Sequence, residues 1–167
     1  MEAVTLFSFG YAGWGNSIPQ LLHATAEIER SRGFEPPVFV DVRARRAGRA
    51  KGFRGDTFER SLSRDRYRWM PGLGNLRVLL RRGRMRLVRP AEAYELLGLA
   101  LSEQRRGRRV LFFCSCPSPW QASTCHRRLV ANTLKGVAKR LRVRLHVDEW
   151  PGGRPGATPV ELRVDPR

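Results

Sequence analysis

The residues best suited to chemistry lie in one segment, positions 109–128, which reads RVLFFCSCPSPWQASTCHRR. It holds all three cysteines of the chain, Cys114, Cys116 and Cys125, and His126 follows the last of them directly. Core packing would scatter cysteines along a chain, so their clustering indicates a site. Their number is odd, and the two cysteines of a C-x-C pair rarely bond to each other. We therefore expect reduced thiols or thiolate ligands in place of a disulfide framework.

Thiolate catalysis is one chemistry that this segment could perform. Cys125 stands where a helical pattern begins, and Arg127 follows it. Unpaired amides, the helix dipole and a nearby arginine all lower the pKa of a thiol. Cys114, at the end of an apolar run, is a second candidate nucleophile, with His126 as its acid/base partner.

Metal binding is a second alternative. Cys114, Cys116 and Cys125 could supply three thiolate ligands, or two thiolates could act with His126 and a water, and zinc and iron are the candidate metals. The spacing argues against a standard zinc site, because paired zinc ligands usually stand farther apart than C-x-C or adjacent C-H.

Anion binding at the start of the helix is a third alternative. Backbone amides and the Arg127 side chain could hold a phosphate without covalent chemistry, and the cysteines would then be buried packing residues. Adjacent residues on a helix point about 100° apart, so Cys125 and His126 cannot face one ligand equally. His126 could instead hold loop carbonyls.

Four further residues are candidates because each follows an apolar run or a glycine. Asp41 and Arg43 stand at the end of a second apolar strand. Asp41 could act as an acid/base group and Arg43 could bind phosphate, or the two could form a solvated strand end. Tyr11 follows the first strand and could stack on a base or sugar, or cover the core. Asn75, after Leu73-Gly74, could bind a ligand amide or complete a turn.

The elements that must position these residues alternate between strand and helix. Strands are predicted at 4–9, 38–42, 67–70, 109–114 and 142–147, and helices over 17–32, 56–62, from Pro90 onward, and over about 125–140. In the helix after Pro90, the residues Tyr94, Leu97 and Leu101 share one side. Residues 76–89 fit either a hairpin or an irregular excursion.

This pattern predicts an α/β fold in three layers, with a mainly parallel sheet and helices on both faces. We expect one domain over residues 1–149 and a tail rich in glycine and proline over 150–167. In such folds ligands bind at the carboxyl ends of the strands. That rule brings Tyr11, the Asp41–Arg43 segment and the cysteines to one edge of the sheet.

The chain is strongly basic, with a net charge of +17. Residues 43–89 hold fifteen arginines and one lysine against three acidic residues, which predicts attraction to nucleic acid or a nucleotide. Because 29 of the 32 cationic residues are arginine, genome composition is an alternative explanation for arginine over lysine. It does not explain the shortage of acids. Neither a signal peptide nor an apolar run of membrane-spanning length is apparent, so we expect no membrane partner and a cytoplasmic location.

Several of these segments, taken in order, resemble one known family. They are Phe9-Gly10-Tyr11-Ala12-Gly13, Val40-Asp41-Val42-Arg43, Phe58–Leu62, Tyr67, Leu73-Gly74-Asn75 and, after the strand ending in Cys114, Cys125-His126-Arg127. Over residues 5–135 the chain resembles the bacterial and archaeal domain-of-unknown-function family numbered 488. The resemblance implies an α/β fold and a cytoplasmic setting, but no established reaction.

The sequence departs from the common family pattern at two places. Many members have a glutamate two residues after the strand-end cysteine, whereas this chain has Cys116 and resembles a C-x-C branch with a Leu-Gly-Asn element. After Arg43 the family commonly has a proline with a serine nearby, and here the chain reads Ala44-Arg45-Arg46-Ala47-Gly48. The ligand of this loop can therefore differ.

Two functional hypotheses follow. In the first, the protein is an enzyme acting on a phosphorylated or nucleic-acid-derived substrate: Arg43 and Arg127 hold phosphate, a cysteine thiolate attacks or polarises, and Asp41 or His126 moves protons. In the second, it is a non-catalytic nucleic-acid-binding module that uses Arg45, Arg46, Arg49 and the arginines of 81–89, with a structural or metal-holding cysteine cluster. The sequence leaves open the choice between them, DNA or RNA, and the oligomeric state.

Overall fold

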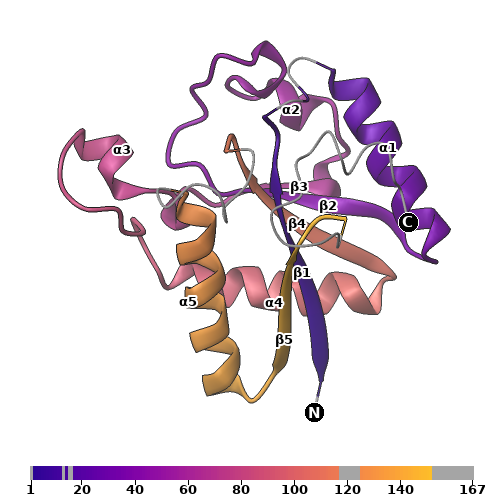
Figure 1. Ribbon diagram of the computed structural model, residues 1–167. Helices are drawn as coiled ribbons and strands as arrows, with labels where there is room; N and C mark the ends of the chain where they lie inside the picture. Colours follow the sequence, from indigo (N-terminus) through magenta and orange to yellow (C-terminus); the bar gives the residue numbers. More distant parts are fainter. Residues whose placement is uncertain (1, 13, 15–16, 117–124, 152–167) are drawn as a thin grey trace.

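The computed structural model describes residues 2–12, 14, 17–116 and 125–151 (Figure 1). Five strands form one all-parallel sheet in the order β3-β2-β4-β1-β5. The strands are β1 (Ala3–Gly10), β2 (Glu35–Asp41), β3 (Tyr67–Trp69), β4 (Arg108–Cys114) and β5 (Arg144–Glu149). The helices are α1 (Ile18–Ser31), α2 (Thr57–Arg60), α3 (Leu76–Leu80), α4 (Glu92–Arg105) and α5 (His126–Leu141), with 3₁₀ turns at Lys51–Phe53, Arg64–Arg66 and Pro71–Leu73.

Alternation along β4 shows how the sequence builds the three layers. Val110 and Phe112 join the core beneath α4 and α5, whereas Leu111 and Phe113 join an aromatic core beneath α1 and α2. Successive side chains of a strand point to opposite faces, so a strand that is apolar throughout must be covered on both. The predicted three-layer α/β fold is confirmed (Figure 1).

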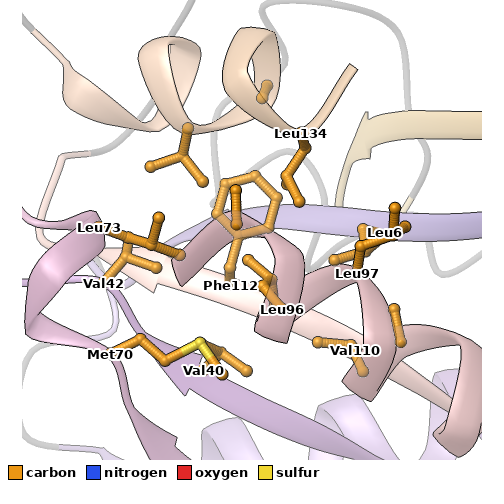
Figure 2. Packing of buried hydrophobic residues seen from close by; sticks show 14 of the residues in the cluster. Leu6, Val40, Val42, Met70, Leu73, Leu96, Leu97, Val110, Phe112 and Leu134 are labelled. Atoms are coloured by element: carbon orange, nitrogen blue, oxygen red, sulfur yellow. The ribbon is translucent and has the colours of Figure 1, made fainter. Parts of the chain in front are cut away.

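The core beneath α4 and α5 consists of aliphatic side chains packed around the ring of Phe112. Phe112 lies between Leu96 and Leu134, with Val40 and Met70 toward one end of the cluster (Figure 2). The opposite core is richer in aromatic rings, which meet edge-on or stacked. These two cores fix the sheet from both sides and so fix where its strands end.

The helical connections change from one face of the sheet to the other between β1 and β4. These strands are neighbours, but the helix after β1, α1, packs on one face and the helix after β4, α5, packs on the other. At such a switch point the connections diverge and leave room at the carboxyl edge, which is where ligands bind in open α/β sheets. Gly10 and Cys114 pair directly at this place.

Several boundaries and faces differ from the sequence-based prediction. β2 begins at Glu35 and includes Pro36 and Pro37, because a register irregularity between Glu35 and Val38 accommodates residues that cannot donate to the ladder. In α4 the face against the sheet is Ala93, Leu96, Leu97 and Ala100, and Tyr94 is exposed. Of the predicted side, Leu97 is buried and Leu101 packs partly buried against the same core, whereas Tyr94 stands outside the buried face.

Residues 75–89, which we call the arm, form the irregular excursion and not the hairpin. The short helix α3 is followed by a loop, and one isolated bridge joins Asn75 to Leu87. In Figure 1, α3 and this loop extend away from the sheet.

No helix among the described residues is long and apolar enough to cross a membrane. The expected tail lies almost wholly outside the described residues, which end at Pro151, so the domain boundaries stay a prediction.

Candidate functional site

The three cysteines meet at the carboxyl edge of β4. Cys114 is the last residue of β4, Cys116 lies two residues on, and Cys125 occupies the position before the first residue of α5. Their sulfur atoms all lie within 4.8 Å of one another, and those of Cys114 and Cys125 are 3.6 Å apart. The expected cysteine cluster is confirmed, and three sulfurs so placed could hold a metal ion.

Backbone packing against Gly10 sets the position of this cluster. A β-carbon at Gly10 would lie 1.7 Å from the carbonyl oxygen of Cys116, so only glycine lets the segment after β4 pass so close to β1. The amide of Cys116 then donates to the Cys114 sulfur over 3.4 Å. The position of the cysteine cluster thus depends on a residue that has no side chain.

Arg127 supports the cysteine cluster from the interior of the protein. Its side chain is fully buried, and one terminal nitrogen donates to Ser8 Oγ at 2.8 Å and to Glu149 Oε1 at 2.7 Å. The other terminal nitrogen donates to the carbonyl of Cys116 at 2.9 Å. Arg127 therefore joins β1, β5 and the C-x-C segment, and it places a positive charge beside the sulfurs.

The negative charge of the cysteine cluster is centred on the sulfur of Cys125. Burial raises the pKa of the Cys114 thiol well above its usual value. Hydrogen bonds from Cys114 and Cys116, with the Arg127 cation nearby, lower the pKa of Cys125. Because interacting groups titrate as a unit, the cluster as a whole loses its first proton easily and the thiolate is centred on Cys125.

A second buried network stands across the edge, at the end of β2. Arg43 makes a two-pronged ion pair with Asp41, at 2.8 Å to Oδ1 and 2.6 Å to Oδ2, and also donates to the Tyr11 hydroxyl at 3.2 Å and the Phe53 carbonyl at 2.8 Å. The Tyr67 hydroxyl donates to Asp41 at 2.9 Å. Burial, with Asp41 beside it, raises the pKa of Tyr67. Every oxygen of Asp41 is thus engaged inside the protein.

His126 holds a loop carbonyl. Its Nε2 lies 2.8 Å from the carbonyl oxygen of Val42, and burial lowers the pKa of the ring. The neutral ring with its proton on Nε2 donates this hydrogen bond, which ties the start of α5 to the end of β2. This is the carbonyl-holding alternative that the sequence left open.

A cavity of about 550 Å³ separates the two networks. Six predicted site residues line it, together with most of the segment 43–50, which we call the basic loop, and with Val78 of the arm. The six are Tyr11, Arg43, Asn75, Cys114, Cys116 and His126. Asp41, Cys125 and Arg127 are absent from the lining, and each is buried and bonded to a residue that does line it.

Two lining residues make contacts that the sequence left open. One face of the Tyr11 ring stacks on Phe53, with centroids 3.9 Å apart, so the ring covers the core as well as the cavity. The Asn75 side chain accepts from the amide of Arg77 and caps α3. The loop between Cys116 and Cys125 lies outside the described residues, so the anion cradle expected from its amides stays a prediction.

Sequence reasoning missed Ser8 and Glu149, and it placed Gly10 at this edge without its close approach to Cys116. Ser8 is a buried polar residue near the end of β1, and Glu149 ends the last strand. A polar residue between Phe7 and Phe9 was the available signal for Ser8. Nothing in the spacing signalled that Glu149 would pair with Arg127, because β5 reaches β1 only through the fold.

Fold and site together define a class: a parallel α/β domain with a three-cysteine centre at its topological switch point. A family model described as domain of unknown function DUF488 matches residues 23–134. The chain belongs to this family. The match spans the Asp41–Arg43 pair and the cysteines, whereas Tyr11 and Glu149 lie outside it. No protein of curated function and no solved structure matches the chain.

Proposed function

We propose that the protein is an enzyme whose reactive centre is the cysteine cluster and whose substrate is phosphorylated or derived from nucleic acid. One observation carries the proposal: three sulfurs converge at the wall of a cavity that exposed arginines of the basic loop also line. Reactive sulfur and cationic side chains on one cavity suit an anionic substrate.

The two cavity-lining cysteines have the better access to substrate. Cys114 and Cys116 line the cavity, whereas Cys125 does not. We assign Cys114 as the nucleophile and Cys125 as its base, because their sulfurs are 3.6 Å apart and the negative charge rests on Cys125. The Cys114 sulfur forms the new bond, its proton passes to the Cys125 thiolate, and the leaving group departs with its bonding electrons.

The roles proposed for the charged residues follow from what they touch. Arg43 faces the cavity and binds the anionic group together with Arg45 and Arg49. Asp41 and Arg127 are positioning residues, because Asp41 holds Arg43 and Arg127 holds the carbonyl of Cys116. His126 fixes the loop after β2 through its Nε2 proton, so its role in proton transfer is that of an acceptor at Nδ1.

A metal-bound form of the same centre uses the same residues. Sulfur ligands at about 2.3 Å in a tetrahedral arrangement stand about 3.8 Å apart, close to the distance between Cys114 and Cys125. Zinc or iron would then be held by Cys114, Cys116 and Cys125 and would supply a Lewis acid at the cavity wall. Elemental analysis of the purified protein separates the forms: one equivalent of metal supports this one, and none supports the free thiolate.

Alkylation with iodoacetamide across pH tests the thiolate. Mass spectrometry assigns the modified cysteine. We expect the cysteine cluster to be alkylated at a rate that has levelled off by neutral pH, and Cys125→Ser to move the midpoint upward. A midpoint near the free-thiol value of about 8.5 in the unaltered protein would remove the basis of the proposal.

The alternative is a non-catalytic nucleic-acid-binding module. The observation that favours it is the set of exposed arginines in the arm that form no ion pair with any residue that the structure describes. Cys114→Ser separates the two: it should abolish turnover in an enzyme and leave electrostatic binding unchanged.

A further inference from the structure

The arm presents concentrated positive charge. Between Asp65 and Glu92 the chain has eight arginines and no acidic residue. Five of the six arginines in the arm are exposed and form no ion pair within the described part of the chain, and Arg89 pairs with Glu92. The five are Arg77, Arg81, Arg82, Arg84 and Arg86.

This charge surrounds a hollow of its own. A space of about 440 Å³ within the arm is lined by Arg77, Arg82, Arg84 and Arg86, with apolar side chains between them. The exposed side chain of Val78 continues from the arm to the wall of the cysteine cavity. The arm therefore contributes to the wall of the cavity that the sulfurs line.

Trp69 adds an exposed aromatic ring at the carboxyl edge of the sheet, next to Arg46 of the basic loop. It ends β3, its side chain is 42 % exposed, and its indole nitrogen donates to the carbonyl of Arg43 at 2.9 Å. The guanidinium of Arg46 lies 4.4 Å from the ring centroid. Rings beside a cationic groove form stacking platforms for unpaired bases.

We propose that the arm, Trp69 and the basic loop bind a single strand of nucleic acid and lead one of its nucleotides into the cysteine cavity. The arm holds backbone phosphates, Trp69 stacks on an unpaired base, and Arg45 and Arg49 hold the phosphate at the cavity. The choice of an unpaired strand rests on the stacking ring and on a cavity within the size range of pockets for small ligands, about 300–1,000 Å³. This inference deepens the proposed function by naming its substrate class.

Fluorescence anisotropy with a labelled single-stranded oligonucleotide, as DNA and as RNA, tests the proposal. The unaltered protein should bind one of them with an affinity that falls steeply with salt. A triple variant, Arg82→Gln, Arg84→Gln and Arg86→Gln, should lose at least tenfold in affinity, and its log–log salt slope should shrink by about 2, since each lost phosphate contact contributes about 0.7. The matched control, Lys135→Gln, Lys139→Gln and Arg144→Gln, removes the same charge from exposed positions away from this edge and should bind nearly as the unaltered protein does.

Trp69 variants separate stacking from loop support. Trp69→Ala should lose on the order of tenfold in affinity, whereas Trp69→Phe keeps a ring, loses the hydrogen bond to Arg43 and should bind close to normally. Equal loss in both variants would overturn the stacking role.

Three other results would overturn the proposal: no binding at low salt, equal loss in the arm and control variants, or tighter binding to a duplex of the same sequence. The proposed enzyme centre fails separately. Strand binding through the arm together with ordinary thiol reactivity would keep this inference and refute the reactive cluster.

Discussion

Replacement of Arg127 by methionine removes the buried cation while filling much of its space. Glu149 then loses its charged partner, Ser8 loses a donor, and the carbonyl of Cys116 loses the bond that holds it over Gly10. Removal of one partner of a buried ion pair costs about 3–5 kcal/mol. With a urea dependence of about 2 kcal/mol per M, the unfolding midpoint should fall by roughly 1.5–2.5 M.

The defect should depend on pH with a defined sign. Burial raises the pKa of Glu149, and Arg127 opposes that rise. Without Arg127, the folded-state pKa rises further above the unfolded value of about 4.3. A group of this kind stabilises the fold fully below its unfolded pKa, and this contribution is lost as pH rises through the folded pKa. The defect of Arg127→Met should therefore be smaller at about pH 5 than at about pH 8.

Two further variants make this prediction decisive. Arg127→Met with Glu149→Gln removes the stranded carboxylate, so it should be more stable than Arg127→Met alone and lack the added pH dependence. Lys135→Met, an exposed position on the same helix, should shift stability by no more than about 0.5 kcal/mol. Urea unfolding followed by circular dichroism measures all three. A shift for Arg127→Met no larger than that for Lys135→Met would refute the positioning role of Arg127.

Three further predictions concern Gly10, Asp41 and His126. Gly10→Ala places a carbon 1.7 Å from the Cys116 carbonyl oxygen and should lower stability by roughly 1–3 kcal/mol, whereas Gly136→Ala, with open space in α5, should raise it by roughly 0.5–1 kcal/mol; thermal unfolding compares them, and equal effects would contradict the close approach. Asp41→Asn leaves the buried Arg43 without its charged partner and should cost about 3–5 kcal/mol, against about 0.5–1.5 kcal/mol for Tyr67→Phe; urea midpoints at neutral pH check the order. Burial lowers the folded-state pKa of His126, so stability should be lost as pH falls through its unfolded value of 6.5, and His126→Asn should flatten the curve between about pH 7 and 5; an unchanged slope would show that another group titrates.

The sequence predicted the sheet edge well because apolar runs and the parallel-strand rule are sufficient to place strand ends together. Asp41, Arg43 and the cysteines follow such runs, and they meet as expected. The sequence could not tell which of these side chains would face a ligand. Arg127 points into the protein because Ser8 and Glu149 lie behind it, and β5 reaches that place only through tertiary structure.

The buried face of α4 was predicted only in part. Large apolar residues at helical spacing indicated Leu97 and Leu101, which pack on the core, but they did not show that Ala93 and Ala100 share that face or that Tyr94 is exposed. The arm was ambiguous because its arginines alternate with apolar residues, a pattern that strand and helix templates fit equally poorly. Its path is held by few contacts, among them the bridge between Asn75 and Leu87.

The ultraviolet absorbance of thiolate, titrated against pH in the unaltered protein and in Cys125→Ser, tests the reactive sulfur cluster most directly. We predict one thiolate per chain that persists well below the ordinary thiol range, and its loss or a large upward shift in the variant. Three thiols that all ionise near about 8.5, with Cys125→Ser removing only one ordinary titration, would contradict the shared centre.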